Sequence, residues 1–393
     1  MTSRHYLPAW YRTSFSWTVA TFALSTVALS ALALVASTTV QIPTASAADQ
    51  PQYEFDSQQV PAARADEPKL PELSVSKALA HLDMGSKLWS NSRRCIACHT
   101  NGSYLQIRPA LTNHFGPPAA EARDFYIDQL QALQMRDEKK LKESTVPAQV
   151  IYLAAGLAEW DAHVTKKLSP ETSAALKLML DIQLESGTWG TLDCWPPFES
   201  DAYHEATVAA MAIGTAPGWL AQLTDEKQTA AVARLRKYLQ TEKPLHDYSR
   251  VLLLWASTRL PDLITDSQRQ EMVEMIFKHQ RTDGGWSIRT FAKPEAWGGG
   301  NRAGKLREEP EFANPPSDGH QTGLAIIVLR AAGVDAKDPR IQRGIEWIKV
   351  NQRESGRWWT RSLNTDKWHF ITYSGTCYPL LALAQCDALP AKP

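Results

Sequence analysis

Two kinds of helical segment alternate along most of the chain. In the first kind, apolar residues recur every three or four positions and leave one polar face, as in residues 76–91, 120–135, 173–184, 225–240, 267–280 and 339–352. In the second kind, apolar and small residues cover nearly the whole circumference, as in residues 104–111, 146–160, 202–214, 248–257, 319–333 and 373–386. A helix that is apolar all round must be buried, whereas one with a polar face suits an outer layer. The pattern predicts an all-α fold of about six outer–inner helix pairs.

A short repeat marks the junction between an outer and an inner segment. The pattern Gln-x-x-x-Gly-x-Trp occurs at residues 183–189, 280–286 and 352–358, each time after an amphipathic segment and before an apolar one. Helix pairs of this kind bury their inner faces only against neighbouring pairs. Six pairs are therefore expected to close into a double ring of helices, a single (α/α)6 toroid.

These three copies resemble the QW repeats of the superfamily that contains squalene cyclases and protein prenyltransferases. The resemblance covers residues 75–390 and implies the toroid fold. It also implies that the Gln and Trp side chains of the repeat are structural, with the amide bonding backbone at helix ends and the indole packing beside it.

The first turns of the inner helices point towards one mouth of such a ring, where catalytic groups are expected. Two clusters of His and acidic residues stand there: Asp201, His204 and Glu205 in one, and Asp318 and His320 in the other. Paired imidazole and carboxylate groups suit general acid–base chemistry. The alternative is that the acids only cap their helices.

The sequence departs from both chemistries of the superfamily. Squalene-type cyclases carry Asp-x-Asp-Asp-Thr-Ala at an inner helix, where this chain has His204-Glu205-Ala-Thr and no Asp-Asp pair. Thr376-Cys377-Tyr378 is similar to part of the last prenyltransferase helix, but the matching Asp-x-Cys is absent. Squalene cyclases also have two helical domains, and this chain offers one.

A second motif lies between the first outer and the first inner segment, near the same mouth. Cys95-Ile-Ala-Cys98-His99 has the spacing of c-type haem attachment, in which two thiols bond the porphyrin and the imidazole binds iron. A redox-active Cys pair would leave His99 unexplained. A zinc site would require Cys98 and His99 to bind one ion as sequence neighbours, which is strained, and a fourth ligand is not evident.

The flanks of this motif resemble class I cytochromes c over residues 80–118. Gly85 and Trp89 precede the motif as a Gly and an aromatic residue do in that family, and Arg108-Pro109-Ala-Leu111 follows it. The resemblance implies haem c and a Pro109 carbonyl that orients His99. The usual distal Met loop is missing, so His114, Met135 or an open position are the alternatives for the sixth ligand.

The first residues predict export. Arg4 and Arg12 precede an uncharged stretch, and Thr-Ala-Ser-Ala47 resembles a cleavage site, so residues 1–47 are interpreted as a signal peptide. An uncleaved membrane anchor is the alternative.

Residues 48–73 are rich in Pro and Gln and are predicted to be a flexible, disordered linker. Residues 74–118 are then the haem-attachment segment that forms the first hairpin, and residues 119–390 the rest of the toroid.

Composition narrows the functional classes. Lys plus Arg and Asp plus Glu balance at 42 each without a basic run, which argues against nucleic acid as a partner. The 14 Trp residues suit repeated packing or a cavity for an apolar guest.

The leading hypothesis is an exported, periplasmic haem c protein, near a membrane, with two kinds of partner. Its toroid would hold an apolar ligand such as an isoprenoid for redox or isomerisation chemistry, or pass electrons to a redox partner protein. A terpene-cyclase-like enzyme without haem and a non-catalytic interaction scaffold are the alternatives, so enzymatic activity is undecided at this point.

Overall fold

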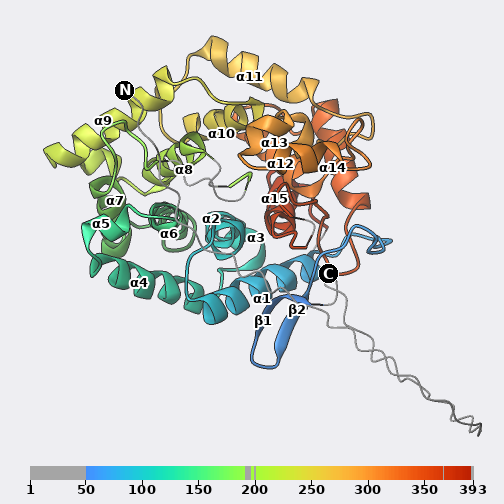
Figure 1. Cartoon of the computed structure of the whole chain (residues 1–393), viewed down its shortest axis with the longest axis horizontal. Coiled ribbons are helices and arrows are strands. Elements are labelled where there is room, and N and C mark those ends of the chain that lie inside the picture. The colour runs from blue at the N-terminus through green and yellow to red at the C-terminus, as the bar shows by residue number, and fades with distance from the viewer. Residues whose placement is uncertain (1–49, 191–195, 199–200, 366, 391–393) are drawn as a thin grey trace, which may run out of the picture. The chain divides into compact units, whose positions relative to one another are not determined.

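Two concentric layers of helices form the described part of the chain, which comprises residues 50–190, 196–198, 201–365 and 367–390 of this computed structural model. The predicted signal peptide, residues 1–47, lies outside these residues. The outer helices are α1 (Val75–Arg93), α4 (Ala120–Gln134), α7 (Pro170–Asp181), α9 (Glu226–Thr241), α11 (Asp266–Lys278) and α14 (Pro339–Val350). The inner helices are α2 (Ser103–Ile107), α6 (Val146–Trp160), α8 (Ala202–Thr215), α10 (Asp247–Ser257), α13 (Gly319–Ala331) and α15 (Ile371–Gln385) (Figure 1).

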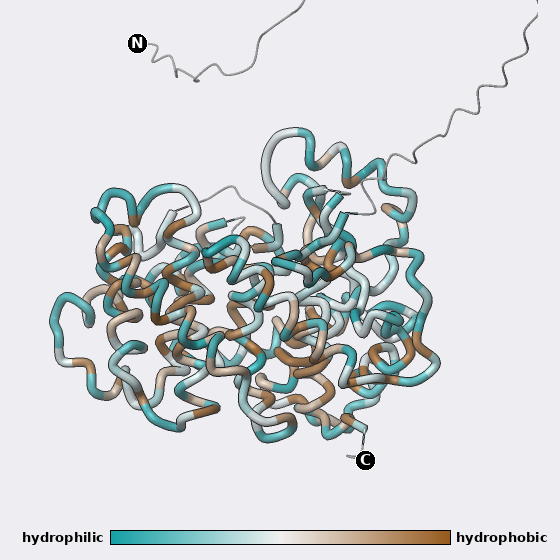
Figure 2. Tube along the Cα trace, turned by 90° about the horizontal axis from the view of Figure 1, so that it is seen from below, coloured by the Kyte–Doolittle hydropathy of each residue, from teal (hydrophilic) through white to brown (hydrophobic). Residues whose placement is uncertain are grey.

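The inner helices form a closed ring. Each packs against the next in chain order, and the last, α15, packs against the first, α2. Burial follows the predicted difference between the layers: α15 is buried along nearly its whole length, whereas α14 buries one face around Ile341, Ile345 and Ile348. Figure 2 accordingly shows apolar segments gathered inside and hydrophilic segments at the periphery. The predicted all-α (α/α)6 toroid is confirmed.

Shorter elements join the layers. The first inner helix changes from α to 3-10 geometry at η3 (Arg108–Leu111), where Pro109 has no N–H to continue the α-helical bonds. The remaining short elements are α3 (Thr112–Phe115), α5 (Glu138–Leu141), α12 (Arg302–Arg307), the π-helical turns η2 (Cys98–Gly102) and η4 (Asp161–Thr165), and the 3-10 turns η5 (Leu220–Gln222), η6 (Ile288–Thr290) and η7 (Pro294–Trp297).

The three Gln–Trp turns share one set of hydrogen bonds. Each indole N–H donates to a carbonyl ten residues earlier: Trp189 to Met179 (2.8 Å), Trp286 to Ile276 (2.7 Å) and Trp358 to Ile348 (2.7 Å). Each Gln amide donates to the carbonyl of the Gly that follows it by four positions, at 3.1, 2.8 and 2.9 Å. These side chains therefore tie the end of an outer helix to the turn that follows it.

Two constraints require glycine in each turn, the backbone conformation and the space available for a side chain. Gly187, Gly284 and Gly356 have φ values of 92°, 91° and 87°, which disfavour any residue with a Cβ. A Cβ on them would also come within 2.4–2.8 Å of backbone atoms of the next outer helix, at Arg234, Arg343 and Lys77 respectively. Because Lys77 belongs to α1, the last turn closes the ring onto its first helix.

The segment predicted to be a flexible linker is instead ordered against the toroid. It forms an antiparallel hairpin of β1 (Pro51–Phe55) and β2 (Gln58–Pro61), which packs on α1. Tyr53 and Val60 are buried, as are Ala62 and Ala63 beyond the hairpin. The prediction was wrong because the segment is held by tertiary contacts, with α1 directly after it and with the turn at residues 352–358 almost 300 residues away, which its own periodicity does not report.

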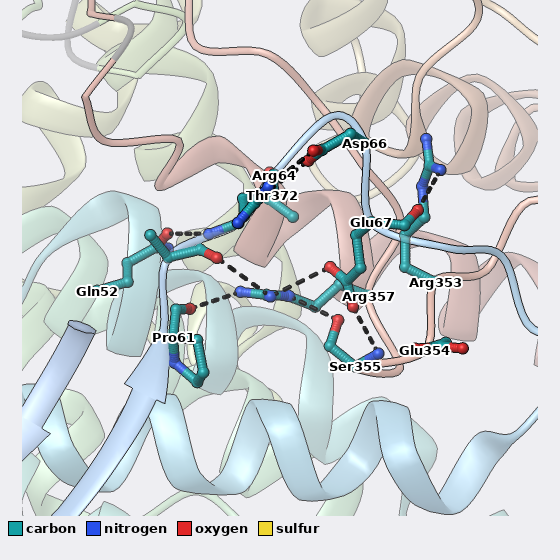
Figure 3. A network of polar contacts seen from close by, with 12 residues as sticks. Gln52, Pro61, Arg64, Asp66, Glu67, Arg353, Glu354, Ser355, Arg357 and Thr372 are labelled. Carbon is teal, nitrogen blue, oxygen red and sulfur yellow. Dashed lines mark hydrogen bonds and ion pairs between the residues drawn. The ribbon is translucent and has the colours of Figure 1, made fainter. Parts of the chain in front are cut away.

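Arg357 of the last Gln–Trp turn holds this segment. Its guanidinium donates to the carbonyl of Pro61 at 2.8 Å and lies 3.2 Å from a carboxylate oxygen of Glu67, as Figure 3 shows. The other oxygen of Glu67 accepts the backbone N–H of Ser355 at 2.6 Å. We call residues 61–74 the closing strap, since they lie along the turn at residues 352–358 where the ring closes. Among the described residues, we find no helix that is long and apolar enough to cross a membrane.

Candidate functional site

The Cys-x-x-Cys-His segment occupies a well-ordered bend between α1 and α2. The first helix, α1, is capped by Arg94, whose left-handed conformation turns the chain and whose N–H bonds the carbonyl of Ser90. The buried side chain of Asn101 then accepts the N–H of Ala97 at 2.8 Å and donates to the carbonyl of Cys95 at 3.1 Å. Asn101 therefore fixes the backbone of the motif from inside, a role that the sequence reasoning missed.

His99 lies in a cage of aromatic rings. Its imidazole stacks on Phe370 with ring centres 4.6 Å apart and meets the edge of Trp89 at 4.9 Å. Its Nδ1 lies 2.8 Å from the hydroxyl of Thr100. Burial lowers the pKa of His99 to about 4, so the ring is neutral at pH 7. Neutral imidazole is the form that binds metals.

The donor set fits a c-type haem. Cys95 is partly exposed, Cys98 is buried and His99 is neutral, so both thiols and one imidazole belong to a single rigid bend. Trp89 and Phe370, whose rings contact His99, also line a neighbouring pocket of about 780 Å³ together with Tyr53, whereas Cys95, Cys98 and His99 are not among its lining residues. That volume is within the range of cofactor sites. In the part of the chain that the structure describes, no cluster of three His, Cys, Asp or Glu side chains is placed to hold a metal ion.

The other residues expected near the haem lie elsewhere. The Pro109 carbonyl accepts the hydroxyl of Thr112 at 2.6 Å, and Nδ1 of His99 bonds Thr100 instead. Met135 is 88% exposed at the end of α4. His114 follows η3, so about 14 Å of helix separates it from the end of the ring that carries His99. The structure does not bring Pro109, His114 or Met135 to His99.

The histidines of the two predicted acid–base clusters meet near the ring centre. Nε2 of His204 lies 3.1 Å from the hydroxyl of Tyr152, and Nε2 of His320 lies 3.1 Å from that of Tyr248. The ring of Phe198 contacts both imidazoles, at 5.9 and 5.7 Å between centres. Each His thus bonds a Tyr of the preceding inner helix, a pairing that arises when consecutive inner helices pack together.

The proton on His320 can be assigned from its neighbours. Ser374 donates its only hydroxyl hydrogen to the carbonyl of Ile371 at 2.9 Å. It must therefore accept from Nδ1 of His320, at 2.7 Å, which leaves Nε2 to accept from Tyr248. Burial lowers the pKa of His320 to about 3, so the ring stays neutral. Since Ser374 is not hydrogen-bonded as a donor to the imidazole, this pair does not have the arrangement of an activated serine nucleophile.

The two aspartates of these clusters act as helix caps. Asp201 accepts the N–H of His204 at 2.7 Å at the start of α8. Asp318 accepts the N–H groups of Gln321 at 2.9 Å and Ile288 at 2.7 Å. Burial raises the pKa of Asp318 to about 6.

The third acid, Glu205, is buried on α8 beside His204. The clusters therefore come together through their histidines and Phe198, while each aspartate caps its own helix and Asp318 also binds the N–H of Ile288.

The two candidate sites adjoin one another at the mouth. His99, Phe198 and Phe370 line one narrow gap of about 10 Å³, and Phe198 is the ring that touches both inner histidines. The segment 287–316, predicted to lie near one end of the ring, reaches the same region, where Trp297 packs on His246 at 4.9 Å. The sequence signal for Phe198 was weak, because it lies outside every helix.

The second half of the ring is similar to a known protein family. Residues 219–388 match the family model of the squalene-hopene cyclase C-terminal domain. The match spans α9 to α15 and includes two of the three Gln–Trp turns. It supports the cyclase-like toroid and leaves the first three helix pairs and the Cys-x-x-Cys-His segment outside the matched range. No curated protein matches the chain.

Proposed function

We propose that this protein is an exported haem c protein built on a cyclase-like toroid. In this proposal the thiols of Cys95 and Cys98 bond the porphyrin and Nε2 of His99 binds the iron. The observation that carries it is the bend that leads into η2, which holds both thiols and a neutral imidazole caged by Trp89 and Phe370, two rings that also line a pocket of about 780 Å³.

Bound there, the haem supplies a one-electron redox couple. The residues of the chain have separate tasks around it. Asn101 holds the backbone of the motif, while Trp89 and Phe370 keep water from the imidazole. Export follows from the proposal, because c-type attachment takes place outside the cytoplasm.

The interior of the ring favours electron transfer over isomerisation of a bound isoprenoid. Trp255 of α10 and Tyr378 of α15 make contact across the ring at 6.2 Å, and Phe198 lies between the two inner histidines. An apolar guest at the centre would have to displace these buried side chains. The toroid is better suited to support and insulate a haem at its mouth, with electrons passing to a redox partner protein.

Acid-initiated cyclisation has less support. It needs a protonated carboxylic acid that faces a cavity. The raised pKa of Asp318 points in that direction, but both of its oxygens already accept backbone N–H groups. Those bonds favour the ionised form and a capping role.

The test is an absorption spectrum of the full-length protein, produced with a c-type maturation system and recorded oxidised and dithionite-reduced. A sharp reduced α band, and haem that stays on the chain after denaturation, are expected. The double variant C95S/C98S should lose both, and the control C377S/C386S, which alters two buried thiols, should keep them. A colourless wild-type protein would overturn the proposal.

A further inference from the structure

Thr100 links the imidazole of His99 to the N-terminal hairpin. Its hydroxyl lies 2.8 Å from Nδ1 of His99 and 3.2 Å from the hydroxyl of Tyr53. Tyr53 in turn accepts from the side-chain amide of Gln52 at 3.2 Å. Thr100 and Tyr53 are both buried, so this chain of hydrogen bonds is shielded from competing water.

The hydrogen bond at Nδ1 favours one imidazole nitrogen over the other as the one that faces a metal. A neutral imidazole carries one proton, and a nitrogen that binds iron cannot carry it. With Nδ1 held against the Thr100 hydroxyl, the proton has an acceptor on that side and Nε2 is left for the iron. A hydrogen bond to the far nitrogen also fixes the ring orientation and raises the basicity of the ligating nitrogen.

We infer that Thr100, supported by Tyr53, is the residue that positions His99 for iron. The inference rests on the proposed haem c function. It differs from the cytochrome-like expectation for Pro109, whose carbonyl is taken by Thr112 in this structure.

Tyr53 gives the N-terminal hairpin a part in the same site. Its ring contacts Trp89 edge-on at 6.3 Å and Phe370 at 5.8 Å, the two rings that also contact His99. The hairpin is therefore part of the wall around the imidazole as well as part of its hydrogen-bond chain.

The experiment compares matured holoproteins of the full-length wild type and four variants. T100V removes the hydroxyl and keeps the shape, T100S keeps the hydroxyl, and Y53F removes only the supporting hydroxyl. T112V is the matched control, since it alters the partner of Pro109 instead. The measurements are haem content, reduction potential, and the iron–histidine stretching band of the ferrous protein after photolysis of its carbon monoxide adduct.

We expect T100V to keep its haem, to shift the iron–histidine band to lower frequency and to raise the reduction potential, because the ligand becomes less basic. Y53F should shift both in the same direction by less, and T100S and T112V should match the wild type. Wild-type values for T100V, or the shift appearing in T112V instead, would overturn the inference. If T100V does not accumulate, Y53F decides, and wild-type values for it count against the inference. A wild type without covalent haem would instead refute the proposed function.

Discussion

Gln352 and Ser74 exchange two hydrogen bonds across 278 residues of chain. The N–H of Ser74 donates to Oε1 of Gln352 at 2.7 Å, and Nε2 of Gln352 donates to the carbonyl of Ser74 at 2.8 Å. In the preceding repeat, Nε2 of Gln280 makes the matching bond to Arg340 at the start of α14, at 2.7 Å. The junction between the last and first repeats is therefore built like a junction inside the ring.

Replacing Gln352 by Ala should destabilise the protein by about 3 kcal/mol, since the backbone groups of Ser74 and Gly356 lose buried partners. Urea unfolding followed by circular dichroism measures the change. Q183A is the control: its amide bonds the carbonyl of Gly187, and we expect a loss of about 1 kcal/mol. Equal losses in the two variants would mean that the ring closure is no more costly to disturb than an ordinary turn.

Substituting Ala at Gly284 and at Gly333 distinguishes the free-energy cost of backbone strain from the cost of steric contact. Both have positive φ, 91° and 96°, but a Cβ on Gly284 would meet the carbonyl of Arg343 at 2.8 Å, whereas one on Gly333 meets nothing within 4 Å. We expect G333A to cost about 1 kcal/mol and G284A about 3 kcal/mol or more, as measured by thermal unfolding. A G284A protein as stable as G333A would contradict the tight packing of the turn on α14.

Removing the charge of Arg357 should release the hairpin. R357M keeps the apolar stem but leaves Glu67 and the carbonyl of Pro61 without their buried partner. We expect a loss of about 3 kcal/mol and faster amide exchange in β1 and β2, read by mass spectrometry. The control R64M breaks the exposed pair with Asp66, which solvent screens, and should leave both the stability and the hairpin exchange close to the wild type. Unchanged exchange in the hairpin of R357M would show that other contacts hold it.

The stability of the protein should depend on His320 in mild acid. Burial lowers its pKa in the folded protein to about 3, whereas an unfolded His titrates near about 6.5. Its contribution is therefore complete above about pH 6.5 and is lost as the pH falls towards 3, by about 1.4 kcal/mol per unit inside that window.

The variant H320Q should bind one proton fewer on unfolding between pH 4 and 6 than the wild type does. Urea unfolding at a series of pH values gives this difference as a slope. Y248F keeps the imidazole and should retain the wild-type slope. If H320Q and the wild type have parallel pH profiles, His320 is already charged in the folded state.

The helical layers could be predicted from sequence because the signal is local. A segment such as 146–160 carries its apolar circumference in its own residues, and α6 has those bounds. The N-terminal hairpin and the closing strap could not be predicted in the same way. Tyr53 and Ala62 gain their burial from α1, α15 and Arg357, and nothing in the periodicity of residues 48–73 reports those partners.

In the candidate site, too, residues with a local sequence signal could be predicted, whereas residues that depend on tertiary contacts could not. Cys95, Cys98 and His99 were evident from spacing, and Asp201 and Asp318 from their places at helix starts. Tyr152 and Tyr248 were not, because each meets its His only when consecutive inner helices pack, and the contact of Thr100 with Tyr53 likewise spans 47 residues. A hydroxyl directly after the motif was the one local signal that could have indicated Thr100.

The closing strap also sets the contact order of the fold. Its bonds to residues 352–358 span about 280 to 290 residues, whereas the bonds within each Gln–Trp turn are local. Because long-range contacts form late, the chain is expected to fold first as an open arc of helix pairs and to join its ends last. A chain cut before residue 352 would remain such an arc, with apolar faces bare at both ends, and should aggregate rather than persist as a smaller ring.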